Sequence, residues 1–321
     1  MFYRDLGSTG IKVSEIGFGG WGIGGTTAGP TSYGDVDERT SLDALSRAFD
    51  HGITFYDTAP AYGDGRSESL IGRAFRGRRD HVVIATKAGY QSWSAAPDFS
   101  PKAIRRSVES SLARLECDWI DLLQLHSVPS TALTDDVAAE LHRLQEAGHI
   151  RAWGVSPKAP AEALAMIRTF DMPVVQVNLN MLDVRAFECG LLDHARERGV
   201  AVIARTPLCF GFLTGMLTED AQFPPEDHRS AWPQAQIAAW VRGAARVLAA
   251  ADAPAVQAPG QVALRFCLSH DAVSTVIPGI LTPAEAETNA AASGFGRLSA
   301  AAVSAILDIN QRENFLVRRA S

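Results

Sequence analysis

Short apolar runs recur along the chain, and polar or turn residues follow most of them. Between these runs the apolar spacing changes to that of a helix: Ile104, Val108 and Leu112 recur at intervals of four after the helix-starting pair Ser100-Pro101. Such alternation of strands and helices predicts a parallel sheet with right-handed crossovers. The predicted strands cover residues 16–19, 53–56, 82–86, 119–125, 150–155, 174–175, 200–204 and 273–277.

Eight strands of this kind predict a (β/α)8 TIM barrel, which is an α/β fold. Residues 2–16 contain a central Gly-Ser-Thr-Gly turn and predict an N-terminal β-hairpin that covers the bottom of the barrel. The segments near the C-terminus predict extra helices, and residues 1–321 are expected to form one barrel domain. A doubly wound sheet is the competing architecture, but the glycines between 17 and 25 are not followed by a helix, as its phosphate-binding turn requires.

Two predicted loops, at residues 88–100 and 206–233, are longer than the usual connections between strands and helices of such a barrel. Loops of this length in a compact domain are usually lids or binding loops. Trp21 and Trp93 lie on loops at the open end, and each is interpreted either as lining a substrate pocket or as packing its own loop. Within the second long loop, residues 227–229 (Asp-His-Arg) are interpreted as a solvated turn or a lid contact.

Composition narrows the class of protein. A net charge of -6 gives no general electrostatic reason to bind nucleic acid or an anionic membrane surface. No stretch approaches the roughly 18 apolar residues of a membrane span, and the first residues lack the pattern of a signal segment. The four cysteines are scattered without a CxxC pair, which favours reduced thiols and a cytoplasmic location. The oligomeric state cannot be predicted from these features.

Polar residues after the predicted strands suggest one kind of chemistry. A phenol (Tyr62), an ammonium (Lys87), a carboxylate (Asp57) and an imidazole (His126) all follow strand ends, which meet at one face of a barrel. A nearby ammonium lowers the pKa of a phenol, a carboxylate fixes the ammonium, and an imidazole orients a carbonyl oxygen. No Ser or Cys nucleophile and no metal-binding spacing is evident, so the attacking group is expected to be a hydride from a bound cofactor.

These residues lie in segments that resemble the aldo-keto reductase family over nearly the whole chain. The matching segments include GITFYDTA (52–59) with Tyr62-Gly63, ATK (85–87), DLLQLH (121–126), GVS (154–156), QVN (176–178), residues 207–213, IPG (277–279) and Asn289. The resemblance implies NAD(P)(H)-dependent reduction of an aldehyde or ketone to an alcohol, or the reverse. It also implies that Asp57, Tyr62, Lys87 and His126 form the catalytic tetrad, with Tyr62 as proton donor.

The resemblance also implies a dinucleotide site along the same face. Ser156 and Gln176 would bind the carboxamide of the nicotinamide, and Arg205 occupies the position of an aromatic ring that stacks on it in many members. Backbone amides of the 208–213 loop would hold the pyrophosphate, and the adenosine would lie near residues 278–289. The residues implied in these two parts are Leu208, Gly211, Leu213, Pro278, Gly279, Glu285 and Asn289.

Four positions depart from the family pattern. Pro157 stands where relatives commonly have Asn, and Arg205 brings a charge that can stack or instead favour a substrate carboxylate or phosphate. Leu281 and Glu285 stand where members that prefer NADPH usually have Arg or Lys. An acidic side chain suits a ribose 2′-hydroxyl better than a 2′-phosphate, so the cofactor is expected to be NADP(H) or NAD(H), with NAD(H) accepted at least as well.

Two other functions compete with the reductase. A redox-sensing nicotinamide-binding subunit with slow turnover, like the barrel subunits of potassium channels, would carry the same tetrad. An isomerase or dehydratase on a similar barrel would need a metal or a paired-carboxylate site, which is not evident. The identity of the carbonyl substrate and the direction of the reaction stay open, because pocket loops differ among members of one fold.

Overall fold

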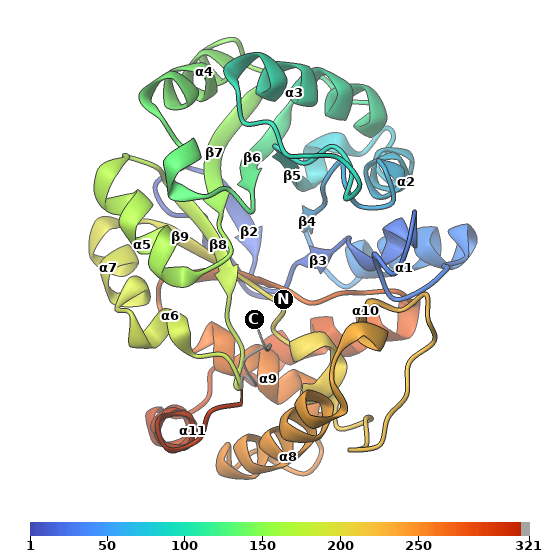
Figure 1. Cartoon of the computed structure of the whole chain (residues 1–321), viewed down its shortest axis with the longest axis vertical. Helices are drawn as coiled ribbons and strands as arrows, with labels where there is room; N and C mark the ends of the chain where they lie inside the picture. Colours follow the sequence, from blue (N-terminus) through green and yellow to red (C-terminus); the bar gives the residue numbers. More distant parts are fainter. Residues whose placement is uncertain (316–321) are drawn as a thin grey trace.

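The computed structural model describes residues 1–315; the last six residues of the predicted domain lie outside the described part. Eight parallel strands form one sheet in the order β10-β9-β8-β7-β6-β5-β4-β3. Backbone hydrogen bonds from Gly17 N to Val276 O and from Gly19 N to Pro278 O, both 2.8 Å, connect the first strand region to β10 and close the barrel. The predicted barrel is therefore confirmed (Figure 1).

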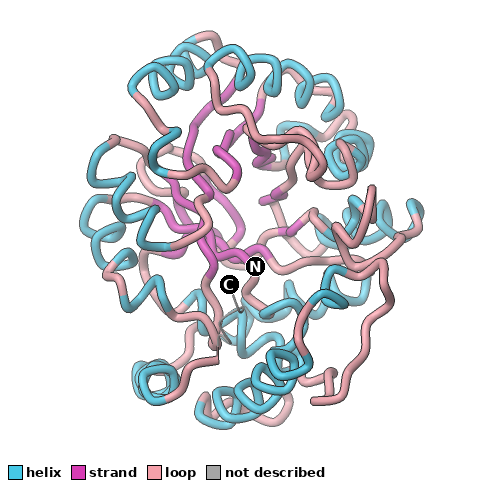
Figure 2. The backbone as a smooth tube through the Cα atoms, viewed as in Figure 1, coloured by secondary structure: helices cyan, strands magenta, loops and turns pink. Residues whose placement is uncertain are grey.

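Helices surround the strands, as Figure 2 shows in cyan around magenta. The barrel strands are β3 (Phe18–Gly19), β4 (Phe55–Asp57), β5 (Val83–Ala88), β6 (Ile120–His126), β7 (Ile150–Ser156), β8 (Val174–Asn178), β9 (Ala201–Arg205) and β10 (Val273–Ile277). The surrounding helices are α1 (Glu38–Asp50), α2 (Arg66–Ala74), α3 (Pro101–Leu115), α4 (Asp135–Glu146), α5 (Pro160–Thr169), α6 (Arg185–Glu188), α7 (Leu191–Arg198), α9 (Pro259–Leu268) and α10 (Pro283–Ala291).

All eight predicted strands are present, with ends that differ by at most three residues. Most of the difference lies at the carboxyl ends, where the polar residue itself pairs in the ladder. Lys87 pairs with Gln124, and Asn178 pairs with Arg205. These polar residues are thus part of the sheet, and its hydrogen bonds fix their backbone positions. The helix start predicted at Ser100 is also confirmed, because its side chain accepts a hydrogen bond from Ala103 N, and Asp37 begins α1 in the same way by accepting from Thr40 N.

The N-terminal hairpin consists of β1 (Tyr3–Asp5) and β2 (Lys12–Ser14). Its buried residues Leu6, Ile11 and Val13 belong to one apolar cluster with inward-facing strand residues such as Phe55 and Leu122. The hairpin therefore fills the lower end of the barrel, as predicted. In Figure 1 the N-terminus lies near the barrel axis.

Two further helices, α8 (Gln234–Ala250) and α11 (Ala300–Arg312), pack against each other at the periphery (Figure 1). Within residues 1–315, α11 is the one α-helix that follows the last barrel helix, whereas α8 lies in the segment between β9 and β10. No single helix within residues 1–315 is long and apolar enough to cross a membrane, although α10 with its following turn and α11, bent by 118°, satisfy that test as a pair.

Candidate active site

The carboxyl ends of the parallel strands carry the predicted catalytic residues. Asp57 ends β4, Lys87 lies near the end of β5, and His126 ends β6. Tyr62 follows β4 in a turn before α2 and is partly exposed. Because parallel strands end at one edge, the four side chains come together at the mouth of the barrel.

A buried ion pair lies at the centre of this group. Lys87 Nζ is 2.5 Å from Asp57 Oδ2 and also donates to the carbonyl of Thr58 at 2.8 Å. The other carboxylate oxygen, Asp57 Oδ1, accepts from Gln124 Nε2 at 3.0 Å and from Gln176 Nε2 at 2.7 Å. The side chains of Lys87 and Asp57 are 1% and 3% exposed. Both charges are thus paired and hydrogen-bonded, which is the condition for keeping an ion pair in an interior.

Tyr62 faces this pair and the imidazole. The Lys87 ammonium lies 4.9 Å from the centroid of the Tyr62 ring, and the Tyr62 and His126 rings are 5.7 Å apart and nearly perpendicular. Burial raises the pKa of Tyr62, and the charge of Lys87 lowers it by less, so the pKa lies above its ordinary value. The prediction that Lys87 acts to lower the pKa of this phenol is correct in direction, but burial outweighs it. The phenol is therefore protonated at neutral pH.

His126 is buried and uncharged. Burial, Lys87 and Arg205 together hold the pKa of His126 well below its ordinary value. Its Nδ1 atom has no hydrogen-bond partner within residues 1–315. Burial alone would lower the pKa of Lys87, but Asp57 and Tyr62 outweigh this effect and hold the pKa above its ordinary value. The centre thus holds a neutral phenol and a neutral imidazole beside a charged pair.

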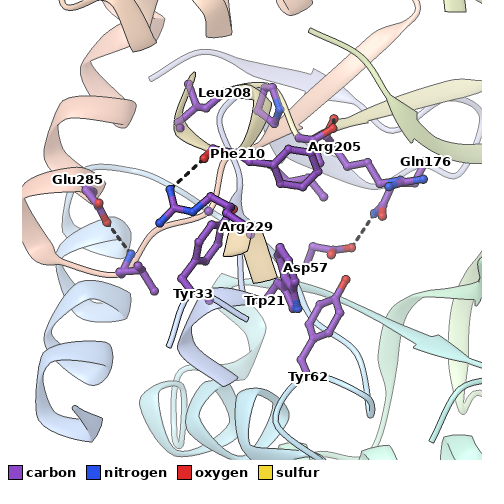
Figure 3. A pocket seen from close by; sticks show the side chains of 18 of the residues that line it. Trp21, Tyr33, Asp57, Tyr62, Gln176, Arg205, Leu208, Phe210, Arg229 and Glu285 are labelled. Atoms are coloured by element: carbon purple, nitrogen blue, oxygen red, sulfur yellow. Dashed lines mark hydrogen bonds between the residues drawn. The ribbon is translucent and has the colours of Figure 1, made fainter. Parts of the chain in front are cut away.

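One pocket of about 480 Å³ begins at Asp57, Tyr62 and His126. It extends past Arg205 to the loops that follow β9 and β10 (Figure 3). Trp21 and Trp93, which were interpreted as either lining a substrate pocket or packing their own loops, both line this pocket. Of the residues predicted to contact the cofactor, the wall includes Gln176, Arg205, Leu208, Gly211, Gly279 and Glu285.

Four predicted cofactor residues do not line this pocket. Ser156 is buried and donates to Gln176 Oε1 at 3.2 Å, so it contacts the pocket only through Gln176. Leu213 and Asn289 are buried, and the carbonyl of Pro278 accepts the closing hydrogen bond from Gly19. The amide nitrogen of Gln176 is itself directed at Asp57, as Figure 3 shows.

The rim of the pocket contains contacts that the sequence did not predict. Arg229, in the loop after β9, donates to Phe210 O at 3.2 Å and to Asp227 Oδ2 at 2.6 Å. Its guanidinium carbon lies 5.0 Å from the centroid of Tyr33, which comes from the loop after β3. Asp227 is only 2% exposed, so of the two alternatives for residues 227–229 the solvated turn is wrong, and the lid contact stays a prediction. The sequence signal for this ion pair was an acidic and a basic residue two positions apart in a long loop.

Glu68 lies outside the reacting group. It is buried in α2 and accepts from Thr86 Oγ1 at 2.5 Å and from Arg114 Nε at 2.6 Å. These contacts join α2 to β5 and α3. Glu68 therefore braces the helix. Within residues 1–315, no cluster of three or more His, Cys, Asp or Glu side chains could hold a metal ion.

The pocket suits a nicotinamide dinucleotide, because one continuous cavity joins the barrel mouth to two loops on its flank. Pockets of 300–1,000 Å³ are typical of cofactor sites. In the loop after β9, Gly211 has φ +96° and bears no side chain towards the cavity, where an added Cβ would come 3.5 Å from Arg229. A backbone without side chains can approach a ligand closely.

Comparison with known proteins agrees with this geometry. The model of the aldo/keto reductase family matches residues 15–311. The chain therefore belongs to the aldo/keto reductase family and is an NAD(P)H-dependent oxidoreductase that acts between carbonyl compounds and alcohols.

Two curated relatives and one solved structure show how similar members of this family are to the chain. The aldo-keto reductase YhdN of Bacillus subtilis is 36% identical over 241 residues, which cover 74% of this chain and 71% of that protein. The NADH-specific methylglyoxal reductase of Escherichia coli is 35% identical over 233 residues, 67% and 70% of the two chains. The structure of the glycerol dehydrogenase AKR11B4 from Gluconobacter oxydans superposes with a TM-score of 0.80 at 28% identity and covers 99% of this chain and 98% of that one.

Proposed function

We propose that this protein reduces an aldehyde or ketone with Tyr62 as the proton donor. The observation that carries the proposal is the phenol of Tyr62 beside a buried, hydrogen-bonded Lys87–Asp57 pair at the mouth of a pocket. A bound nicotinamide dinucleotide would supply the hydride that such a reduction needs. The chain itself supplies the proton and the place for the carbonyl oxygen.

Each residue of the group has a distinct role in this proposal. The carbonyl oxygen lies between the Tyr62 hydroxyl and the neutral His126 ring, which orients it by a hydrogen bond. As negative charge develops on that oxygen, Tyr62 transfers its proton. The resulting phenolate is stabilised by the ammonium of Lys87, because an opposite charge nearby favours the ionised form. Asp57, fixed by the amides of Gln124 and Gln176, keeps Lys87 in place.

We propose that the dinucleotide lies along the pocket with its nicotinamide near Gln176 and Arg205. The Leu208–Gly211 backbone and Arg229 are then the contacts for the pyrophosphate, and Gly279, Leu281 and Glu285 those for the adenosine end. Ser156 acts through Gln176, whereas Leu213, Pro278 and Asn289 support the loops behind. This assignment rests on the order of the residues along one cavity.

NADH is proposed to serve at least as well as NADPH. Glu285 Oε2 accepts hydrogen bonds from the backbone nitrogens of Leu281 and Thr282, at 2.7 and 3.1 Å, at the start of α10. A carboxylate therefore already occupies the helix N-terminus that would favour a 2′-phosphate. We expect kcat/KM for NADH to equal or exceed that for NADPH. A tenfold preference for NADPH in steady-state kinetics contradicts this.

The substitution Tyr62→Phe tests the proton donor. We expect the variant to fold and to bind NADH, measured by fluorescence titration, but to reduce a simple aldehyde at least about 100-fold more slowly. The matched control is Tyr56→Phe, which removes a buried phenol that donates to Ile53 O and does not line the pocket. Unchanged turnover in Tyr62→Phe contradicts the role, and failure of the wild-type protein to complete repeated turnovers favours a slow redox sensor instead.

A further inference from the structure

The charged residues in the pocket wall differ in whether another group compensates their charge. Asp57 is paired with Lys87, Arg229 is paired with Asp227, and Glu285 caps α10. Arg205 is the exception: it forms no ion pair within 4.0 Å among residues 1–315. The pocket therefore carries one positive charge without a direct counter-ion.

The environment of Arg205 leaves much of its guanidinium unused. It ends β9, and Nη2 donates to the carbonyl of Pro157 at 3.1 Å. The Nε atom is buried and has no partner within the described residues. A guanidinium presents five N–H groups and is suited to bidentate binding of carboxylate or phosphate. Because Nε is shielded from the cavity, a ligand that enters the pocket would be bound by the two Nη groups of Arg205.

The position of Arg205 places this charge near the reacting atoms. It lines the same cavity as Tyr62 and His126. Burial and Lys87 have the larger effects on the pKa values of these two side chains, which lie above the ordinary value for Tyr62 and below it for His126, and the charge of Arg205 lowers each by a smaller amount. A carbonyl oxygen held by Tyr62 and His126 would therefore have Arg205 within reach of the rest of a short substrate. The rim cation Arg229, by contrast, is held by Asp227.

We propose that Arg205 determines specificity by binding a carboxylate or phosphate on the carbonyl substrate. The substrate class is thus short oxo acids or phosphorylated aldehydes. This inference rests on the proposed reductase function of the same site. The competing use of Arg205 is to bind the dinucleotide, and the test below separates the two.

The test compares matched substrates rather than single rates. Butanal and 4-oxobutanoate have the same chain length and differ in one carboxylate, and glyceraldehyde and its 3-phosphate differ in one phosphate. We expect wild-type kcat/KM to favour the anionic member of at least one pair by tenfold or more. In Arg205→Met this ratio should fall at least tenfold, because one charge-assisted bidentate contact is lost. Arg205→Lys should restore part of it.

Arg39→Met provides a control for net charge, because Arg39 is 91% exposed on α1. Its selectivity ratio should equal that of the wild type. The binding constant for NADH is measured for every variant by fluorescence titration. A ratio that Arg205→Met leaves unchanged overturns the inference, and a weakened NADH affinity in that variant then assigns Arg205 to the cofactor. Reduction of butanal without any anionic preference overturns the inference alone, whereas failure to reduce every aldehyde overturns the proposed function as well.

Discussion

The pocket has a floor, formed by Asp57, Tyr62, Lys87 and His126, and a rim, formed by Tyr33 and residues 227–229. Each contains a buried carboxylate paired with a cation, but the two pairs are held in different ways. On the floor, the pair Lys87–Asp57 lies on neighbouring paired strands, with side chains 1% and 3% exposed. On the rim, the pair Arg229–Asp227 is 18% and 3% exposed and lies within one loop. That loop is fixed by contacts to another loop, including His228 N to Ser32 O at 2.8 Å. The floor is therefore positioned by the sheet, and the rim by loop-to-loop contacts.

The backbone of the loop after β9 is also constrained. Non-glycine residues with positive φ occur in the loop after β9, at Thr206 (54°), Cys209 (45°) and Phe210 (55°). Such conformations cost free energy and persist where surrounding contacts determine them. The hydrogen bond from Arg229 to Phe210 O is one of these contacts. We infer that the floor sets the chemistry and that the rim sets how tightly a ligand is held.

The largest effect is expected on the floor, from Lys87→Met. This substitution leaves the Asp57 carboxylate buried without its counter-ion, which typically costs about 3–5 kcal/mol of unfolding free energy. Urea unfolding measures it. Adding Asp57→Asn should recover part of the loss, because the uncompensated charge is then removed. A loss no greater than that of Arg229→Met would show that floor and rim do not differ in this way.

On the rim, Arg229→Met should mainly weaken ligand binding. It removes the contact to Phe210 O and the ion pair with Asp227, so the turn that contains Gly211 is less restrained. We expect the dissociation constant for NADH to rise about tenfold, which corresponds to the loss of one net hydrogen bond of about 1.4 kcal/mol. Fluorescence titration measures this. An unchanged constant, or a loss of stability without any loss of affinity, would contradict the proposed role of the rim.

The floor could be predicted from the sequence because a strand end has a fixed direction. Once eight runs were interpreted as parallel strands, Asp57, Lys87 and His126 had to meet at one edge. The hairpin, the barrel and the helix starts at Asp37 and Ser100 follow from equally local signals. Gln124 was part of a recognised segment, but nothing local showed that its amide would donate to Asp57.

The rim could not be predicted because its contacts join segments far apart in the chain. Tyr33 and Arg229 are brought together by a bridge between Ser32 and Asp227 that no sequence periodicity encodes. The burial of Asp227 depends on that bridge, which is why a solvated turn was a reasonable but wrong alternative. The balance of effects on the pKa of Tyr62 was equally out of reach, since burial depends on the assembled pocket.

Two histidines extend the comparison to pH, with the smallest expected effect. Burial, Lys87 and Arg205 hold the pKa of His126, on the floor, well below its ordinary value, whereas burial lowers the pKa of His228, on the rim, to about 4. In both cases the unfolded chain, with a pKa near 6.5, binds the proton first as the solution is acidified. The stability that each neutral imidazole contributes is therefore complete above about pH 6.5 and is lost as the pH falls towards the folded pKa.

Unfolding free energies of His126→Phe and His228→Phe, measured between pH 8 and 4, should therefore decline less steeply on acidification than those of the wild type. One proton bound only by the unfolded chain corresponds to a slope of about 1.4 kcal/mol per pH unit. The rim histidine should account for less than this, because solvent screens a partly exposed ring. His126→Phe should flatten the curve more than His228→Phe, since the buried floor resists protonation further. If the curves of unfolding free energy against pH for both variants run parallel to that of the wild type, neither imidazole is kept neutral by its surroundings. If His228→Phe flattens the curve more than His126→Phe does, the rim disfavours a charged imidazole more strongly than the floor.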